Sequence, residues 1–550
     1  MHAAGVSVRG RLLAGDLEVP PDDIPNYVVG WPVKLSKWAM DRGQSDKASN
    51  ASSGKSAAGD RTNSTLDHRA VRAIVAGIML AMFLSALEQT IVAPALAAIG
   101  RSLGGIDDLS WVVTAYLLSV TATTPLFGKL SDIYGRRLVL LWAIGIFICG
   151  SIACALAPTI WFLIFARGLQ GIGGGGLLPI AQTIIADLLS PRERPIVQGR
   201  TSVMFMSASI LGPVLGGLLT DHLHWSLIFW INLPLGAVAL VMTERALRRL
   251  PRNDRPHRLD VIGGALMVGA ALALMLALAW GGTHYSWNSW RIVALLAGSA
   301  ALWVLFAVRL LTAREPFIPV AILHGRVTSA ITCAAFFGVG TIIGITIFTP
   351  LYCQAVLGLT ASSSGLALIA FMGGTVAGSL ITARLMVRLT HYLRVPIVGL
   401  LLAIAALLVL AHDTAAHSVM IVALLLFLLG CGLGPMYPMS TILMQNAVKP
   451  HQLGTATGAL NFFRTLGGAI IVAIFGAIVL GGGNGWKAVS LEGLATAHGN
   501  LAPAFHWVFI AAAVCLAITL VCLLAVEERP LHGPAHRAEE ATIEAAQATP

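Results

Sequence analysis

Three ionisable side chains, Glu88, Arg167 and Arg464, lie deep inside long apolar stretches of the sequence. A charge near the centre of a bilayer costs about 2.5 to 3.5 kcal/mol even on a lenient insertion scale, so residues of this kind are candidates for function. Burial favours the protonated form of a carboxylic acid, whereas a nearby arginine favours the ionised form. We therefore predict that Glu88, together with Arg167, can bind and release a proton near neutral pH.

Other polar residues in the apolar stretches could contact a bound molecule or hold helices together. Arg464 suits both roles, because a buried guanidinium can donate to backbone carbonyls as well as to a ligand. The remaining candidates for such contacts are Gln170, Gln354, Tyr437 and Gln445.

Charge and glycine are combined in the segment GKLSDIYGRR at 128–137, which we read as a connector between two apolar stretches. The segment is too short to form a domain. Ordinary loop charge explains neither its Asp132 nor its two glycines, Gly128 and Gly135, which we expect in turns.

A second glycine-rich segment, LGPVLGG at 211–217, lies within an apolar stretch. Its Pro213 removes a backbone donor and kinks a helix, and small residues let a neighbouring helix approach closely in a membrane. We predict a bend and a packing face made by Gly212, Gly216 and Gly217.

The motifs of enzymes give no support for catalysis. Residues 171–176 (GIGGGG) fit the G-x-G-x-x-G dinucleotide pattern, but that pattern has meaning only between a strand and a helix, and here it falls within an apolar stretch. Close helix packing through small residues explains it better. The sequence holds no H-E-x-x-H or kinase motif, so we expect no enzyme activity, no cofactor and no metal site.

The elements that position these residues follow from composition. Of 550 residues, 56% are hydrophobic and 11% charged, whereas a soluble protein has about 25% charged residues. Apolar runs of the ~20 residues that cross a bilayer as a helix recur from residue 71 onward, which predicts an all-α membrane protein with fourteen transmembrane helices. Their approximate ranges are 72–97, 110–130, 138–157, 160–188, 198–220, 226–243, 260–280, 291–311, 328–352, 363–388, 395–411, 417–446, 454–480 and 503–526.

The distribution of basic residues predicts the orientation of these helices. Cytoplasmic connectors carry an excess of Lys and Arg, and nearly all of the 36 such residues fall on one side, with Arg101, Arg291 and Lys487 on the other. We predict that both termini are cytoplasmic, and that the net charge of +10 reflects topology rather than nucleic-acid binding. The polar segments are interpreted as a disordered tail at 1–70, a basic linker at 244–259 and a second tail at 527–550.

Five segments in chain order carry family patterns: ALEQTIVAPAL at 86–96, GKLSDIYGRR at 128–137, ARGLQGIGGG at 166–175, LGPVLGG at 211–217 and HWSLIFWINLPLG at 224–236. Together they resemble the major facilitator superfamily, in particular its fourteen-helix drug:proton antiporters. The chain departs from that pattern where the family has Asp and this sequence has Glu88, and where the W-R-W of the family is Trp225-Ser226-Leu227.

The resemblance implies the major facilitator fold, with six-helix bundles at 71–243 and 326–526 and an inserted helix pair at 260–311. Cargo would bind near the midplane, between bundles that rock to open each side in turn. The implied activity is proton-driven export of amphipathic, often cationic compounds across the plasma (inner) membrane. Glu88 and Arg167 would couple the proton.

The resemblance also implies a cytoplasmic latch at 128–137. In it the Asp132 carboxylate would lie against a neighbouring helix N-terminus or an arginine. The latch would consist of Gly128, Asp132, Gly135, Arg136 and Arg137.

Two other functions stay open. One is a dedicated exporter of a single metabolite, such as a siderophore, antibiotic or sugar. The other is a membrane sensor on the same fold, which the intact Glu88, Arg167 and Asp132 disfavour. The expected partners are a small-molecule substrate, protons and the lipid bilayer, with a monomer as the transport unit; a periplasmic adaptor and an outer-membrane channel stay open.

Overall fold

The structure, a computed structural model, describes residues 68–105, 108–247, 259–282, 285–389, 391–412, 414, 418–481 and 501–528. Within these ranges, fourteen helices are long and apolar enough to cross a membrane, which confirms the predicted number and the all-α class. The predicted tails at 1–70 and 527–550 and the linker at 244–259 lie largely outside the described residues.

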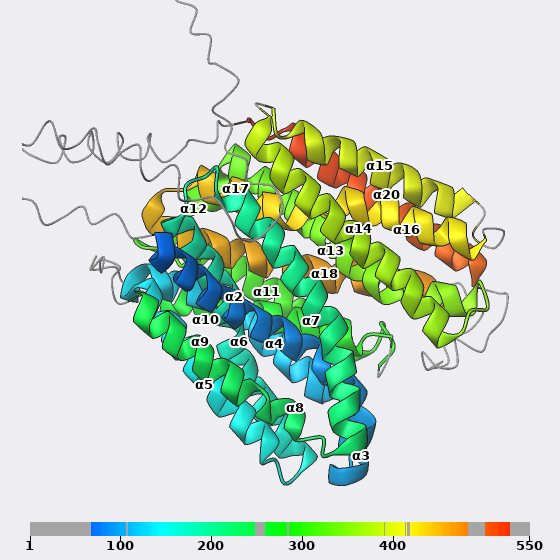
Figure 1. Ribbon diagram of the computed structural model, residues 1–550, viewed down its shortest axis with the longest axis horizontal. Coiled ribbons are helices and arrows are strands. Elements are labelled where there is room, and N and C mark those ends of the chain that lie inside the picture. The colour runs from blue at the N-terminus through cyan, green and yellow to red at the C-terminus, as the bar shows by residue number, and fades with distance from the viewer. Residues whose placement is uncertain are drawn as a thin grey trace, which may run out of the picture. The chain divides into compact units, whose positions relative to one another are not determined.

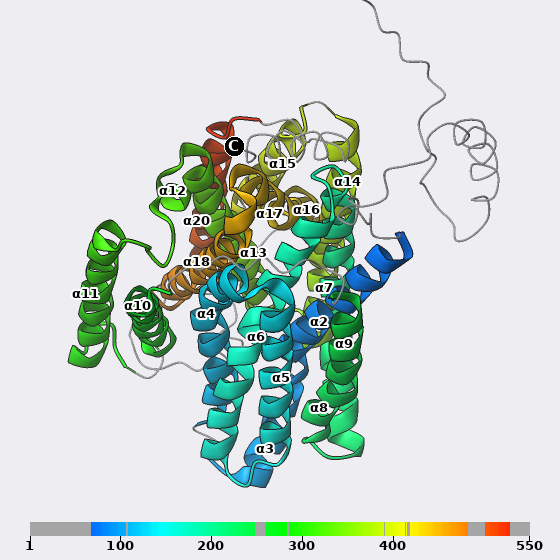
Figure 2. The same ribbon diagram turned by 90° about the vertical axis from the view of Figure 1, so that its left-hand side faces the viewer.

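The first six spans form one bundle, in which α6 packs against both α4 and α5 (Figure 2). A Cβ atom on Gly171 would lie 2.5 Å from the carbonyl oxygen of Tyr116, and one on Gly173 would lie 2.4 Å from the backbone nitrogen of Phe147. Such an approach requires glycine, so segment 171–176 is a packing face, as predicted. The elements are α2 (His68–Ile91), η1 (Ala93–Ala95), α3 (Leu96–Leu103), α4 (Leu109–Tyr134), α5 (Arg136–Ala155), α6 (Ile160–Leu188), α7 (Arg194–His222), α8 (Leu227–Trp230) and α9 (Asn232–Leu247).

The last six spans form a second bundle around one continuous apolar core (Figure 1). Glycines again set the closest approach: Cβ atoms on Gly374 and Gly378 of α14 would lie 2.1 and 2.0 Å from carbonyl oxygens of α16. The elements are α13 (Arg326–Ala355), α14 (Ala361–Arg388), α15 (Arg394–His412), α16 (Val419–Leu433), α17 (Met436–Ala447), η3 (Pro450–Gln452), α18 (Leu453–Gly481) and α20 (Ala502–Leu524).

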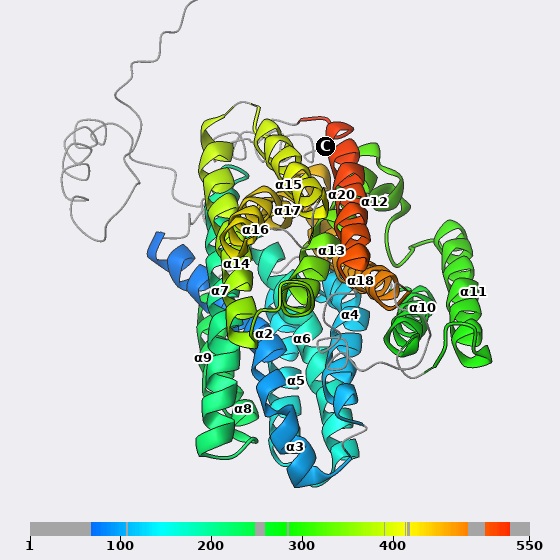
Figure 3. The ribbon, with the colours of Figure 1, turned by 90° about the vertical axis from the view of Figure 1, so that its right-hand side faces the viewer.

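Two further spans, α10 (Val261–Trp280) and α11 (Trp290–Thr312), form a hairpin between the bundles in sequence. α10 contacts α4 of the first bundle and α18 of the second, while α11 lies outside α10 at the edge of the helical body (Figure 3). Arg309 donates to the Asp260 carboxylate at 3.1 Å and so links the end of α11 to the start of α10. The short helix α12 (Val320–His324) leads into the second bundle.

The two bundles meet through α4 with α18 and through α7 with α14. We call the side on which α4 ends and α18 begins the basic side, because its connectors carry nearly all of the Lys and Arg residues outside the tails. On this side a Cβ on Gly128 would lie 2.4 Å from the Gly454 carbonyl oxygen. The expectation that Gly128 lies in a turn was therefore wrong. Gly128 is helical, and a larger residue would not fit there because another helix lies against it.

Helix ends differ from the predicted spans where proline interrupts the chain. α2 ends at Ile91, and after the turn η1, which contains Pro94, α3 extends the first span to Leu103 rather than 97. The span predicted at 417–446 is likewise divided into α16 and α17, with Pro435 at the start of α17. Proline cannot donate a backbone hydrogen bond, so helices break or restart beside it.

Candidate functional site

An ion pair between Glu88 and Arg167 lies inside the first bundle. The Glu88 residue is 0% exposed and Arg167 is 1% exposed. Arg167 also donates to the Gln170 side chain at 2.6 Å and to the Val112 carbonyl at 3.0 Å, and the Tyr116 ring lies 4.3 Å from its guanidinium carbon. Both charges are thus out of water and balance one another.

Further helices complete the polar cluster around this pair. Asn232 at the start of α9 donates to the second Glu88 oxygen at 2.6 Å, and Gln170 donates to the Ser151 hydroxyl of α5 at 2.8 Å. Both Glu88 oxygens therefore accept hydrogen bonds, which suits an ionised carboxylate. We did not single out Asn232 and Ser151 from the sequence, although Asn232 lies in the I-N-L-P part of the motif at 224–236.

A second charged group joins the bundles on the basic side. Asp132 near the end of α4 accepts hydrogen bonds from the backbone N–H groups of Gly454 and Thr455, at 3.0 and 2.6 Å, and from the Thr455 hydroxyl at 2.6 Å. These N–H groups belong to the first turn of α18, where helical donors lack partners. Arg136 pairs with Asp132 and donates to Asp187 at 3.1 Å.

The neighbours of Asp132 differ from the grouping drawn from the sequence. Arg137 pairs with Glu244 of α9 within the first bundle, not with Asp132. Gly135 is the single residue between α4 and α5 and has φ +88°, a conformation that favours glycine.

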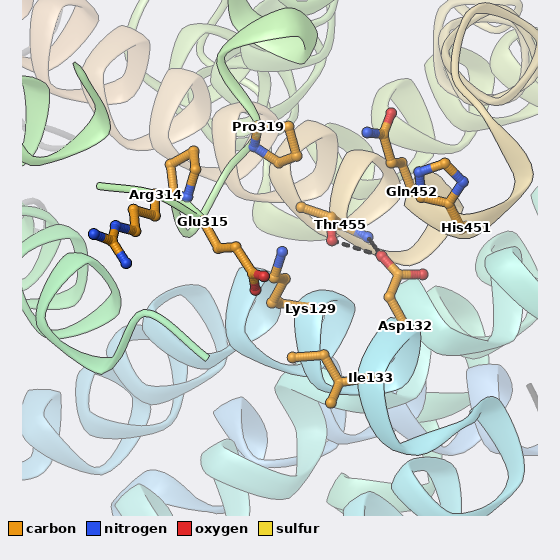
Figure 4. A pocket seen from close by; sticks show the side chains of 10 residues that line it. Lys129, Asp132, Ile133, Arg314, Glu315, Pro319, His451, Gln452 and Thr455 are labelled. Carbon is orange, nitrogen blue, oxygen red and sulfur yellow. Dashed lines mark hydrogen bonds between the residues drawn. The ribbon is translucent and has the colours of Figure 1, made fainter. Parts of the chain in front are cut away.

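A cavity of about 250 Å³ lies beside this contact (Figure 4). It is bounded by the end of α4, by the segment 314–319 that follows α11, and by residues from 451 to 455 in η3 and the first turn of α18. Figure 4 shows the Glu315 and Lys129 side chains next to one another on one wall, opposite His451.

The glycine segment 211–217 packs against α2 through only part of its length. A Cβ on Gly212 would lie 1.9 Å from the Thr90 hydroxyl oxygen, and one on Gly216 would lie 2.3 Å from the Ile91 carbonyl oxygen. Nothing lies within 4 Å of the Cβ position of Gly217. Including Gly217 in the packing face was wrong, because it points away from α2. Pro213 lies inside the continuous helix α7.

Arg464 is buried in the second bundle at 2% exposure. It donates to the Asn461, Ser440 and Thr441 side chains at 2.9, 2.6 and 2.8 Å and to the Tyr437 carbonyl at 2.7 Å. The ring of Tyr437 covers its guanidinium at 4.2 Å.

The other predicted contact residues separate into two places. Gln445 of α17 donates to the Gln182 carbonyl of α6 at 3.1 Å, and Asn461 donates to the Gln182 side chain at 2.8 Å, so both reach the first bundle. Gln354 instead lies near the end of α13 opposite the basic side and donates to Ser364 at 3.2 Å. Sequence reasoning missed Gln182 and Asn461; Asn461 lies one turn before Arg464 on α18, a spacing that places them on one helix face.

These features define a polytopic membrane protein of two helical bundles that meet at one side, with an ion pair sealed in the first. Residues 78–259 and 247–472 match the family profile of the Major Facilitator Superfamily. The chain belongs to that superfamily, whose members are transporters.

Named relatives and solved structures agree with this assignment. The chain is 33% identical over 406 residues to the "Multidrug transporter protein MdtP" of Bacillus subtilis (strain 168), covering 74% of this chain and 75% of that protein. It is 33% identical over 414 residues to "Multidrug resistance protein 3" of the same organism, covering 75% and 80%. The crystal structure of a bacterial homologue of the iron transporter ferroportin in the outward-facing state superimposes with a TM-score of 0.58 at 13% identity, covering 83% and 98%. That likeness concerns the fold alone.

Proposed function

We propose that the protein is a proton-driven efflux antiporter for amphipathic compounds in the plasma membrane, with the basic side and both termini in the cytoplasm. The observation that carries the proposal is the sealed pair of Glu88 and Arg167, because a buried carboxylate balanced by one arginine can change charge only by taking up a proton. The names of the two Bacillus relatives support export of drugs.

The structure corresponds to a state closed toward the basic side. The cross-bundle hydrogen bonds named here, those of Asp132 with α18, Gln182 with Asn461 and Ser202 with Ser379, all lie in the half of the helices nearest that side. Cargo from the cytoplasm enters only after these contacts separate, which is the alternating access expected of two rocking bundles.

A path leads from Glu88 to the bundle interface along the helices α2 and α7. Two residues beyond Glu88, Thr90 donates to the Ala208 carbonyl of α7 at 3.1 Å and lies against Gly212. Toward the basic side the same helix bonds α14 through Ser202. Protonation of Glu88 removes the charge that holds Arg167 and Asn232, so a shift of α2 passes to α7 and from there to the second bundle.

The proton gradient supplies enough energy for export. One charge moving inward yields about 2.3 kcal/mol per 100 mV, and each pH unit adds about 1.4 kcal/mol. Together these support a concentration ratio of a few hundredfold for a neutral compound at one proton per cycle.

The test is substrate movement by purified protein in liposomes with an imposed pH gradient. Glu88→Gln keeps the size and polarity of the side chain, so we expect substrate binding to persist and uphill movement to fall to the background of empty liposomes. The matched control is Asp221→Asn, which neutralises an exposed carboxylate of α7 and should leave transport unchanged. Undiminished uphill movement by Glu88→Gln would place the coupling carboxylate elsewhere.

The dedicated exporter of one metabolite is the alternative. A panel of unrelated amphipathic compounds tested in the same liposomes distinguishes the two, since a dedicated exporter moves one compound class and a drug exporter moves several.

A further inference from the structure

Arg464 is a buried cation that lacks a counter-charge. Its four hydrogen bonds go to neutral acceptors on α17 and α18, and no ion pair with Asp or Glu is formed among the residues that the structure describes. Arg167, its counterpart in the first bundle, has Glu88. A buried charge normally persists only when paired, so the place of a counter-charge beside Arg464 is unfilled by the residues that the structure describes.

Three buried polar atoms without hydrogen-bond partners occur in the same cluster: Arg464 Nε, Gln182 Nε2 and Gln445 Oε1. The three residues are linked, because Asn461 bonds both Arg464 and Gln182, and Gln445 bonds the Gln182 carbonyl. Buried polar groups of this kind are usually satisfied by a partner, a water or a ligand. Two of the three atoms are donors, which favours a ligand with acceptor oxygens.

The cluster lies at the interface between the two bundles. Gln182 belongs to the first bundle and the other residues to the second, and the partly buried Tyr437 ring meets Phe205 of α7 with 6.0 Å between centroids. When the bundles separate on the basic side, Asn461 loses Gln182 and Tyr437 loses Phe205. The unpartnered Nε–H of Arg464, the Asn461 amide and an aromatic face then border the opened path together.

We propose that Arg464, with Asn461 and Tyr437, forms a subsite for a carboxylate carried by an amphipathic cargo. A guanidinium binds a carboxylate through two parallel hydrogen bonds, and the Tyr437 ring supplies a surface for the apolar body. Glu88 is the only carboxylate far from a helix end in the described spans, and it is already paired with Arg167. These spans therefore offer a cation to an acidic cargo, but they offer no unpaired carboxylate to a cationic cargo. The inference rests on the proposed function in that the cargo is the exported compound.

The test compares three fluorescent probes on one scaffold, 1-pyrenebutyrate, its N-methylamide and 1-pyrenebutyltrimethylammonium, binding to the purified full-length protein in nanodiscs without a gradient. Wild type should bind the carboxylate at least about tenfold more tightly than the amide, because hydrogen bonds to charged groups are the stronger class. Arg464→Gln should abolish this preference and leave amide binding within about twofold. Arg101→Gln, at an exposed arginine of α3 on the other side, should change none of the three affinities.

Arg464→Lys keeps the positive charge in the bundle and tests the subsite even if the Gln form does not fold. Its carboxylate preference should fall at least about threefold, since an ammonium lacks the planar fork. Equal binding of acid and amide by wild type, or a proportional loss of all three probes in both variants, would overturn the proposal. Glu88→Gln should retain the preference, so that a failure of proton coupling and a failure of the subsite give different results.

Discussion

At the residue scale, Glu88 and Arg167 depend on each other because neither has access to water. Removing one member of a buried ion pair leaves an uncompensated charge, whereas replacing both members is often tolerated. Two neutral residues, Gln170 and Asn232, hydrogen-bond the charged pair. Neither of them can balance the charge that remains when one member of the pair is removed.

This mutual dependence predicts the outcome of a double-mutant cycle. Arg167→Met should destabilise the protein by about 3–5 kcal/mol, because Glu88 is left buried and unpaired. The double variant Glu88→Gln/Arg167→Met should recover more than half of that loss, although it should not transport. Unfolding of purified protein in mixed micelles measures all four corners of the cycle. If the two losses simply add, the residues are not coupled.

The sequence identified the charged residues of the two buried polar clusters but not their neutral partners. Glu88, Arg167 and Arg464 stand out because ionisable groups are costly in apolar stretches. Asn232, Ser151 and Gln182 carry no such signal: amides and hydroxyls are common in helices, and only the packing of helices far apart in sequence decides which of them meet a charge.

At the element scale, hydropathy predicted every spanning helix, because each must cover the same thickness of hydrocarbon. It did not predict which side of a helix faces protein. The segment 128–134 has the composition of a connector but continues α4, since its glycine lies against α18. In the same way Gly217 shares a motif with Gly212 and yet meets no neighbour.

That difference yields a matched pair of substitutions on α7. Gly212→Leu would drive a side chain into Thr90, and overpacking typically costs about 1–3 kcal/mol, so transport should fall at least about fivefold with membrane insertion retained. Gly217→Leu places its side chain in open space and should transport like wild type. Liposome transport, normalised to inserted protein, compares the two; equal loss in both would contradict the packing described for α7.

The contact between α4 and α18 predicts a shift of conformational populations. Asp132→Asn loses the charge that attracts the first turn of α18, and hydrogen bonds to charged groups contribute about 1.5–3 kcal/mol. The state open to the basic side should therefore gain about tenfold or more in population.

Spin labels on Tyr134→Cys and His451→Cys, in a background without the native cysteines, report this opening through their distance distribution. Glu244→Gln is the control, because it breaks a pair inside the first bundle and should leave the distribution unchanged. A distribution unaltered by Asp132→Asn would show that the carboxylate does not hold the bundles together.

At the scale of the whole molecule, one sequence carries two bundles whose mutual contacts are gathered toward one side. The proposed alternating access requires these contacts to break in each cycle. They are made by hydroxyls, amides, one carboxylate at a helix N-terminus, one arginine that donates to an amide and one aromatic pair. The larger apolar core lies in the second bundle and extends into α10 and α11, and a separate apolar core lies in the first bundle.

A covalent bond across this interface should stop the cycle. The hydroxyl oxygens of Ser202 on α7 and Ser379 on α14 lie 2.7 Å apart, so Ser202→Cys/Ser379→Cys, in a background without the native cysteines, should form a disulfide when oxidised. The bond would hold the basic side closed, and transport from that side should fall to background, then return on reduction. Each single cysteine variant is the control and should be insensitive to the oxidant. In the proposed cycle, cargo enters between the bundles. Full transport by the oxidised, cross-linked protein would therefore show that the bundles do not separate on the basic side during transport. It would also contradict the proposed coupling of Glu88 to that separation through α7.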